Sequence, residues 1–335
     1  MNAETPVFVS IVTFNDSQWL AACLESVFAQ SVAVTVTVFD NGSTDSSRDV
    51  AARFPVKLIA APQNLGFSVA HNRNILSDDS PYVLVLNPDA FLERYFIERL
   101  LAVFQALRQT GMAGGKMLRL DPAGKLKIRA GFPILDSTGV YFTPAQRHFD
   151  RGSEEPDRGQ YEKRQLMFGI TGAAVLYCRE MIEDIRDGDE IFDEDFFAYR
   201  EDVDLAWRAQ LRGWKAVYEP SAKALHRRSV LPSNRAAVSA LLNRHSLKNR
   251  YLMRIKNMDA AVRRRCFPHM WLRDVGILAY ALLKERSSLP AYAEVRRLRP
   301  RFEKKREFVQ SRRTVPPAEV ARWFAFKPVA KSIGE

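Results

Sequence analysis

Short apolar runs alternate with segments of helical periodicity along the first hundred residues of the chain. The apolar runs are rich in β-branched residues and predict strands at 7–13, 34–39, 56–60 and 82–86. Apolar positions at helical spacing predict helices at about 17–28, 45–54, 68–76 and 93–107. Strands that alternate with helices predict a Rossmann-like α/β fold, in which helices cover both faces of a mostly parallel sheet.

The later part of the chain follows a different pattern. Residues 166–177 have strand character, and 203–211 carry a helical apolar stripe. Two short strands are predicted at 216–218 and 222–225. From about residue 233 onward the sequence becomes helical and basic. We therefore predict an α/β domain over residues 1–232 and a basic, helical C-terminal extension over residues 233–335.

The net charge of +11 is spread unevenly over the 335 residues. Residues 1–221 carry 23 Lys and Arg against 31 Asp and Glu, whereas residues 222–335 carry 27 against 8. Such asymmetry points to a polyanionic partner for the C-terminal part: a membrane surface, a diphosphate or a nucleic acid. No recognisable nucleic-acid module accompanies the charge, so we expect no nucleic-acid partner.

Several classes of protein are disfavoured by what the sequence lacks. Three widely separated cysteines argue against a disulfide framework and a zinc cluster, and favour a reducing cytoplasm. The first residues do not resemble a signal peptide. The longest late apolar run, 275–283, is far shorter than the ~20 residues of a spanning helix. No glycine-rich dinucleotide motif follows the first strand. The sequence thus predicts a cytoplasmic protein, soluble or peripheral on a membrane.

Polar residues follow the predicted strands and are expected to converge on one crevice, because open α/β sheets bind ligands at the carboxyl ends of their strands. Among them, Asp89 ends the motif Leu86-Asn87-Pro88-Asp89. A carboxylate there can hold a divalent ion, Mg²⁺ or Mn²⁺, against the diphosphate of an activated sugar. The alternative is an ordinary turn at the end of a strand.

Two carboxylates, Glu201 and Asp202, open the predicted helix at 203–211. A carboxylate at this place can accept the proton of an acceptor hydroxyl, and the helix dipole is expected to keep Asp202 ionised. The alternative is that either residue only caps the helix.

Three further segments are candidates for binding. Asp40, in Asp40-Asn41-Gly42-Ser43, can accept hydrogen bonds from a pyrimidine base or a ribose, or can form an Asx turn. His226 can complete a metal shell or bind the diphosphate, or have a structural role. The stretch 169–174 brings backbone close to an acceptor sugar, or is a tightly packed strand.

The C-terminal extension interleaves cations with aromatic residues, as in Arg263-Arg264-Arg265-Cys266-Phe267 and in residues 322–327. Aromatic anchors beside cations are typical of a helix that lies on anionic lipid. A helical appendage with a solvated basic face is the alternative.

Taken together and in order, these motifs resemble the inverting glycosyltransferases of family 2, which have the GT-A nucleotide-sugar-binding fold. The matching segments are 9–15, 40–45, 64–67 with His71-Asn72, 86–89, 169–174, 196–205 and His226, which span about two-thirds of the chain. The Asn-Leu-Gly-Phe turn, the Asn-Pro-Asp motif and the late histidine resemble the rhamnosyltransferase-like branch. Asn87 stands where the common Asp-x-Asp motif has its first aspartate, which leaves one carboxylate fewer for a metal.

The resemblance implies a role for each matching residue. Asp202, with Glu201, would be catalytic, with Asp202 as the base of a single inverting displacement. Asp89 and His226 would hold the metal, and Thr171 and Gly172 would contact the acceptor. The residues implied to bind the nucleotide-sugar are Thr13, Asn15, Asp40, Asn41, Asn64, Gly66, Phe67, Asn72 and Asn87.

The resemblance also implies substrates and a location. The donor would be dTDP-L-rhamnose, with a UDP-hexose as the alternative. The acceptor would be a hydroxyl of a lipid-linked saccharide or a cell-surface polysaccharide, which fits a basic extension peripheral on the inner face of the cell membrane. A lower-ranked alternative is a non-catalytic module that binds a nucleotide-sugar or a membrane.

Overall fold

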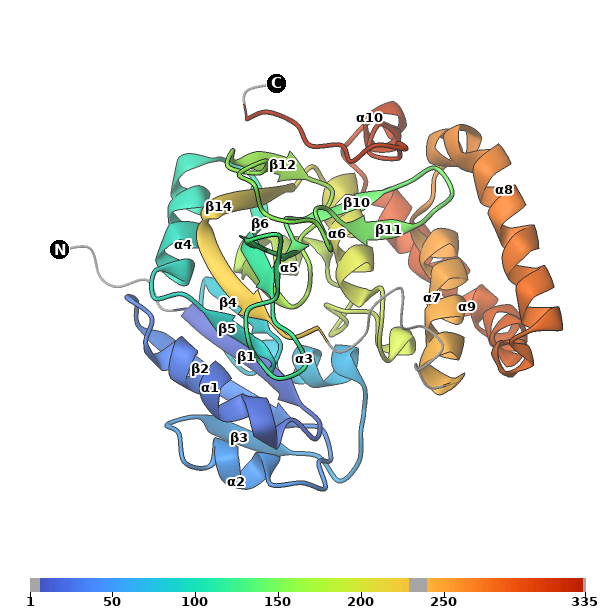
Figure 1. Cartoon of the computed structure of the whole chain (residues 1–335). Helices are drawn as coiled ribbons and strands as arrows, with labels where there is room; N and C mark the ends of the chain where they lie inside the picture. Colours follow the sequence, from blue (N-terminus) through green and yellow to red (C-terminus); the bar gives the residue numbers. More distant parts are fainter. Residues whose placement is uncertain (1–6, 229–239, 334–335) are drawn as a thin grey trace.

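The computed structural model describes residues 7–228 and 240–333, which form an α/β core with helices attached on one side (Figure 1). Ten strands make the central sheet, in the order β12-β14-β6-β13-β4-β1-β2-β3, with β5 beside β14 and β9 beside β6. The strands are β1 (Val7–Thr13), β2 (Val34–Asp40), β3 (Lys57–Ala60), β4 (Tyr82–Leu86), β5 (Ala90–Leu92), β6 (Thr110–Arg119), β9 (Leu135–Ser137), β12 (Gln165–Met167), β13 (Ala174–Cys178) and β14 (Lys215–His226).

Parallel pairing aligns the carboxyl ends of the N-terminal strands. Strands β4, β1, β2 and β3 are parallel neighbours, and Thr13 lies opposite Asp40, which lies opposite Ala60. Strand β13 enters antiparallel between β4 and β6, and β14 runs parallel to β6. The predicted mostly parallel sheet is confirmed, and the polar residues that follow β1, β2 and β4 are brought to one edge.

Helices cover both faces of the sheet, as predicted. Along β4, Val83 and Val85 belong to one apolar cluster while Leu84 and Leu86 belong to the other, since successive side chains of a strand point to opposite faces. The helices of the α/β part are α1 (Ser17–Phe28), α2 (Ser47–Ala51), α3 (Phe67–Ile75), α4 (Phe96–Ala106), α5 (Arg179–Ile185), α6 (Glu201–Leu211) and the 3₁₀ turn η1 (Glu194–Phe196).

Two strand predictions were wrong in detail. The single strand expected at 166–177 is split into β12 and β13, and the residues between them turn into the cleft described below. The two strands expected at 216–218 and 222–225 are one strand, β14, whose register shifts between Glu219 and Lys223. A β-bulge lets one strand continue through the irregular segment that contains Pro220.

Two small hairpins stand outside the main sheet. One pairs β7 (Ile128–Arg129) with β8 (Phe132–Pro133), and the other pairs β10 (Val140–Phe142) with β11 (His148–Asp150). The β10–β11 hairpin lies between the α/β core and the C-terminal helices (Figure 1).

The C-terminal extension is helical, as predicted. It contains α7 (Ala240–Asn257), α8 (Ala260–Leu283), η3 (Arg286–Ser288), α9 (Pro290–Ser311) and α10 (Pro317–Ala321). Its apolar residues share a cluster with the α/β part: Phe324 packs against Phe142 and Trp207, with ring centroids 5.1 and 5.0 Å apart. The predicted boundary at 232/233 falls outside the described residues and stays a prediction. No helix of the described residues is long and apolar enough to span a membrane.

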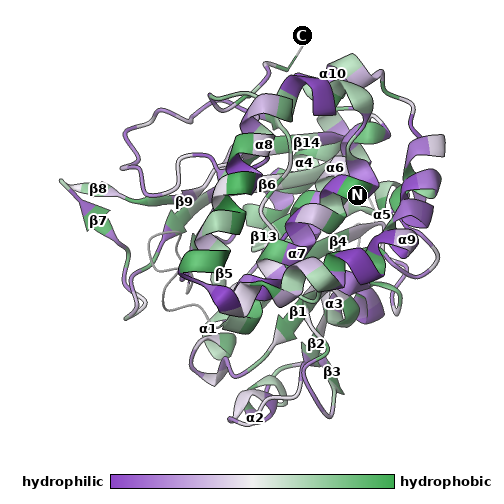
Figure 2. Ribbon diagram, turned by 90° about the vertical axis from the view of Figure 1, so that its right-hand side faces the viewer, coloured by the Kyte–Doolittle hydropathy of each residue, from purple (hydrophilic) through white to green (hydrophobic). Residues whose placement is uncertain are grey.

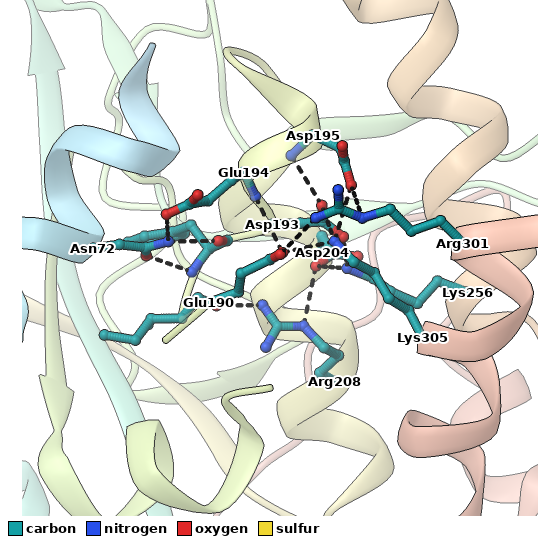
Figure 3. A network of polar contacts seen from close by, with 12 residues as sticks. Asn72, Glu190, Asp193, Glu194, Asp195, Asp204, Arg208, Lys256, Arg301 and Lys305 are labelled. Carbon is teal, nitrogen blue, oxygen red and sulfur yellow. Dashed lines mark hydrogen bonds and ion pairs between the residues drawn. The ribbon is translucent and has the colours of Figure 1, made fainter. Parts of the chain in front are cut away.

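Part of the basic excess of the extension is balanced within the chain (Figure 3). Lys256 of α7 lies 2.5 Å from an oxygen of Asp193 and 2.8 Å from one of Asp204. Lys305 of α9 lies 2.7 Å from the other oxygen of Asp193 and 2.6 Å from Glu190. The ion pairs lower the pKa of the buried Asp193, although burial alone would raise it. The two lysines therefore bind the extension to the segment that leads into α6.

Candidate active site

A cleft of about 470 Å³ opens at the carboxyl edge of the sheet. It is lined by residues that follow β1, β2 and β4, by the turn between β12 and β13, by the segment before α6 and by the end of β14. The predicted site residues that line it are Asn41, Asn64, Gly66, Phe67, Asn87, Asp89, Thr171, Gly172, Glu201, Asp202 and His226. The fold therefore collects in one place residues that are up to about 185 positions apart in the sequence.

Four predicted nucleotide-binding residues are not part of the cleft lining. Thr13 donates its hydroxyl to Asp16, 3.3 Å away. The side-chain oxygen of Asn15 accepts the backbone N–H of Thr44 at 2.8 Å. Two others, Asp40 and Asn72, are buried.

Asp40 and Asn72 have protein partners for their side chains. Asp40 accepts from the guanidinium of Arg48 at 2.5 Å. Asn72 donates to the carbonyl of Phe192 at 2.9 Å and accepts the N–H of the same residue at 2.8 Å. These contacts shape the loops around the cleft. The nucleotide contacts expected of all four residues stay predictions.

The Asn-Leu-Gly-Phe turn packs against the segment that precedes the candidate base. Asn41 holds the turn, because its side-chain oxygen accepts the N–H of Leu65 at 2.8 Å and its amide donates to Asn64 at 3.0 Å. Gly66 has a φ of 86°, and a Cβ there would lie 2.5 Å from the carbonyl oxygen of Phe197. Only glycine fits this close approach.

Asp89 and His226 form the first polar centre of the cleft. The Nε2 atom of His226 lies 3.3 Å from Oδ1 of Asp89, and its Nδ1 lies 2.8 Å from Oδ2 of Asp136. Asp136 is buried and is held in turn by Arg119, whose Nη2 lies 2.6 Å from Oδ1. A chain of four charged or polar groups thus orients the imidazole toward Asp89.

The carboxylates on both sides of His226 decide its protonation. Burial alone would disfavour the imidazolium, but Asp136 and Asp89 stabilise it and raise the pKa of His226 to about 9. The charges of Arg228, His226 and Arg119 hold the pKa of Asp136 below its usual range, against the effect of burial. A carboxylate behind the histidine is the arrangement that orients metal-binding histidines in other proteins.

Glu201 and Asp202 form the second polar centre, at the start of α6. Oδ2 of Asp202 accepts the N–H of Gly172 at 2.9 Å, and Oδ1 accepts the N–H of Val203 at 2.7 Å. Burial raises the pKa of Asp202 despite these hydrogen bonds. That the helix dipole helps to keep Asp202 ionised stays a prediction. A raised pKa makes the ionised form a stronger proton acceptor.

Glu201 differs from its neighbour in its surroundings. Its pKa is raised by burial and by the charge of Asp202, and its Oε2 atom is buried without a hydrogen-bond partner among the described residues. Two neighbouring carboxyls cannot both ionise easily in a buried site, so one is the proton acceptor while the other holds its proton. The hydrogen bonds to the ionised form favour Asp202 as the acceptor.

The backbone before α6 has an unusual conformation. Phe197, Tyr199 and Arg200 all have positive φ, at 63°, 69° and 75°. Left-handed conformations cost free energy for residues other than glycine and persist only where surrounding contacts hold them. Asn249 of α7 supplies such contacts, because its amide nitrogen lies 2.8–2.9 Å from the carbonyl oxygens of residues 196, 198 and 199.

Several residues of the cleft were missed by sequence reasoning. Asp16 lines the cleft near Asp89, and burial raises its pKa to about 6. Arg228 pairs with Asp150, and Nδ1 of His148 accepts a hydrogen bond from the guanidinium of Arg200 at 3.0 Å. Burial and the surrounding arginines hold the pKa of His148 far below its usual value, so the ring is neutral and accepts.

Only some of these omissions had a signal in the sequence. Asp16 follows the first strand, and Arg228 is two residues from His226. Asp136 and His148 lie in a region without motif or regular spacing, so nothing local distinguished them.

The fit of a divalent ion follows from the donor set. Asp89 offers a carboxylate oxygen toward the same part of the cleft as His226, which can bind an ion through Nε2 once that nitrogen has released its proton. Within residues 7–228 and 240–333, no three His, Cys, Asp or Glu side chains gather as a metal site. Two protein ligands suit an ion that takes its remaining ligands from a diphosphate and water, as Mg²⁺ does.

Comparison with known proteins identifies the family. A sequence model of the family described as "Glycosyl transferase family 2" matches residues 8–186. The chain belongs to this family. The chain is also similar to an N-acetylglucosaminyl-diphospho-decaprenol L-rhamnosyltransferase of Mycobacterium tuberculosis (strain CDC 1551 / Oshkosh), at 31% identity over 241 residues, 66% of this chain and 76% of that protein. Membership of family 2, with a rhamnosyltransferase among the relatives, confirms the resemblance noted in the sequence.

Solved GT-A glycosyltransferases share the fold of this chain. S. aureus TarS 1-349 in complex with UDP-GlcNAc superposes with a TM-score of 0.56 at 14% identity, over 94% of this chain and 90% of that one. A mannosyltransferase from Pyrobaculum calidifontis in complex with GDP-Man and Mn²⁺ superposes with a TM-score of 0.53 at 14% identity, over 90% and 84%. At such identities the likeness concerns the fold alone, and the predicted GT-A fold is confirmed.

Proposed function

We propose that this family 2 glycosyltransferase inverts the anomeric centre while moving L-rhamnose from dTDP-L-rhamnose to a hydroxyl of a lipid-linked saccharide, in the synthesis of a cell-surface glycan. One observation carries the catalytic part of the proposal. Asp202, which accepts a hydrogen bond from the N–H of Gly172, lines the same cleft as Asp89 and His226. The rhamnosyltransferase relative, whose name specifies a diphospho-decaprenol acceptor, supports the choice of donor and acceptor.

Each polar centre has a separate task in this reaction. Asp202 takes the proton of the acceptor hydroxyl while that oxygen attacks the anomeric carbon, and the bond to the diphosphate breaks on the opposite face. Glu201 keeps its own proton beside it. Asp89 and His226 would hold a divalent ion, Mg²⁺ or Mn²⁺, which would supply positive charge to the leaving diphosphate.

A UDP-hexose is the alternative donor. Solved structures of similar fold were determined with UDP-GlcNAc or with GDP-Man, so the fold accepts several nucleotide-sugars. The two donors differ in the methyl group of the pyrimidine, in the 2′-hydroxyl of the ribose and in the transferred sugar, and the pocket contacts that separate them are local.

The basic extension supports a place at the membrane, where a lipid-linked acceptor is found. Several of its cations are exposed on α8 and α9, among them Arg263, Arg264, Arg296 and Arg297. We infer a peripheral attachment to anionic lipid on the inner face of the cell membrane.

Asp202→Asn tests the function, with Asp49→Asn on the exposed side of α2 as the matched control. We expect Asp202→Asn to lower kcat about 10²- to 10⁴-fold, the usual worth of a general base, while dTDP binds as tightly as before. Turnover close to that of the wild type would overturn the assignment of the base. Measuring kcat/KM with dTDP-rhamnose and with UDP-hexoses decides between the two donors.

A further inference from the structure

A second and larger hollow lies among the C-terminal helices. This groove has a volume of about 990 Å³, at the upper end of the range for small-molecule sites. It runs between the start of α7 and the second half of α8, and Leu247, Leu272, Ile277 and Tyr280 give it apolar walls. His269 and Lys284 add polar groups to its lining.

Gly276 leaves the groove open at its middle. It lies within α8, where glycine costs about 1 kcal/mol relative to alanine, yet a Cβ added there would meet no atom within 4 Å. Neither close packing nor a positive φ requires glycine at this position. The consequence of the missing side chain is free space in the groove.

The outer face of α8 is apolar and exposed. Its stripe, which we call the α8 stripe, consists of Phe267, Trp271, Val275, Leu278 and Leu282, each at least 42% exposed. Figure 2, in which this side of the molecule faces the viewer, shows apolar turns along α8. Exposed cations flank the stripe at 263–265 and at 284 and 286.

This charge pattern favours lipid over a second copy of the chain. Apolar residues with cations at both ends match a bilayer surface, where the stripe is immersed and the cations meet anionic headgroups. A second copy would bring an identical cationic face against the first, which costs free energy.

The groove lies next to the catalytic cleft. Asn243 of α7 lines the groove, whereas Leu242, the residue before it, lines the cleft. Ala145, in the turn of the β10–β11 hairpin, lines the groove, whereas His148 lines the cleft. Three residues of chain span at most about 11 Å, so the two hollows are neighbours.

We propose that the groove binds the long apolar chain of the lipid-linked acceptor. The α8 stripe then lies on the bilayer, and the anionic headgroup of the acceptor is directed to the cleft. The apolar chain of the acceptor leaves the membrane along α8 and passes Gly276, and the sugar at its end lies near Asp202. This inference rests on the proposed function for the identity of the acceptor, but the groove can be tested without sugar transfer.

A Cβ at position 276 would meet no atom within 4 Å, so Gly276→Trp directs its side chain into the groove. Helix propensity predicts that the variant folds at least as well as the wild type. Ala279→Trp adds the same bulk to α8 at an exposed position outside the groove lining and is the matched control. Melting temperatures of all three proteins come first.

The first readout compares two acceptors with the same sugar diphosphate, one carrying a farnesyl chain and one a methyl group. We expect Gly276→Trp to raise KM for the farnesyl acceptor about tenfold or more, the effect of exposing two CH₂ groups, and to leave KM for the methyl acceptor unchanged. Equal changes for both acceptors, or an equal effect of Ala279→Trp, would overturn the proposal.

The second readout is calorimetric binding of farnesyl diphosphate, which needs no turnover. We expect farnesyl diphosphate to bind the wild type and Ala279→Trp with similar affinity, and Gly276→Trp about tenfold more weakly. This result supports the groove even if neither acceptor receives a sugar. In that case only the proposed function fails. No binding to the wild type overturns the groove. Light scattering tests the remaining alternative. If the wild type is a dimer and Gly276→Trp is a monomer, the groove serves self-association, and the proposal is overturned.

Discussion

The side-chain amide of Asn249 donates to the carbonyl oxygen of Ala198, 2.9 Å away, and so joins the C-terminal extension to the strained backbone before the candidate base. The same amide contacts the carbonyls of Phe196 and Tyr199. The extension is therefore part of the support of the active site, because α7 holds three carbonyls in place just ahead of Asp202.

Asn249→Ala is expected to loosen this support. Buried carbonyls left without a donor cost about 1–3 kcal/mol of stability, and a small displacement of the base can lower kcat up to ~10²-fold. Gln310→Ala, which removes a side-chain amide that donates to the carbonyl of Asn257 at 2.9 Å, is the control. Denaturation curves and kcat for both variants check the prediction, and equal losses of kcat would refute a positioning role for Asn249.

Asp136→Asn is expected to lower the pKa of His226 from about 9 toward 6.5, because the largest stabilising charge next to the imidazolium is removed. Proton NMR titration of the imidazole measures this shift, with His226→Gln used to assign the signal. If a metal is bound as proposed, its affinity also falls, by roughly 10- to 100-fold for a lost partner of a ligand. A titration that does not move would contradict the contact.

Gly172→Ala is expected to move Asp202. The new Cβ would lie 3.2 Å from Cβ of Asp202 and 3.4 Å from its Oδ2, closer than most contacts of this kind. We expect kcat to fall about tenfold or more, since base geometry governs proton transfer. Adding the change to Asp202→Asn should have no further effect, because the base is already lost. Independent, multiplying effects in the double variant would exclude this mechanism.

Glu201→Gln tests the raised pKa of Glu201 through the pH dependence of stability. The folded protein keeps a proton on Glu201 at pH values where the unfolded chain, with an ordinary pKa of 4.5, has lost it. Stability is therefore lost as pH rises above 4.5 toward the folded pKa. Gln does not titrate, so the Tm of the variant relative to the wild type should increase with pH over this window. A constant difference in Tm would show that Glu201 is not protonated in the fold.

Lys305→Met is expected to destabilise the interface between α9 and the segment before α6. The change leaves Asp193 and Glu190 with one cation fewer, and breaking a buried pair costs about 3–5 kcal/mol. Arg299→Met on the same helix removes an exposed pair with Glu303, which is worth about 0–1 kcal/mol. Urea unfolding of both variants checks the contrast, and similar midpoints would contradict it.

Local patterns in the sequence determined the order of the elements and the edge of the sheet at which the site lies. Strand periodicity at 7–13 and 82–86 and the polar residues after each strand were sufficient, because parallel strands bring their carboxyl ends together. Asp89, Asp202 and His226 were identified as candidates for the same reason: each stands beside a predicted element in a spacing that resembles family 2.

Only the tertiary structure decided which groups surround these residues. Asp136 meets His226 across 90 positions, and Asn249 meets the backbone before α6 from a separate helix. Such contacts have no local signal, because they depend on how whole elements pack. The same packing buries Asp202 and so raises its pKa. The sequence by itself determined the elements and the candidate chemistry, whereas burial and long-range pairing determined the electrostatics of the site and the groove beside it.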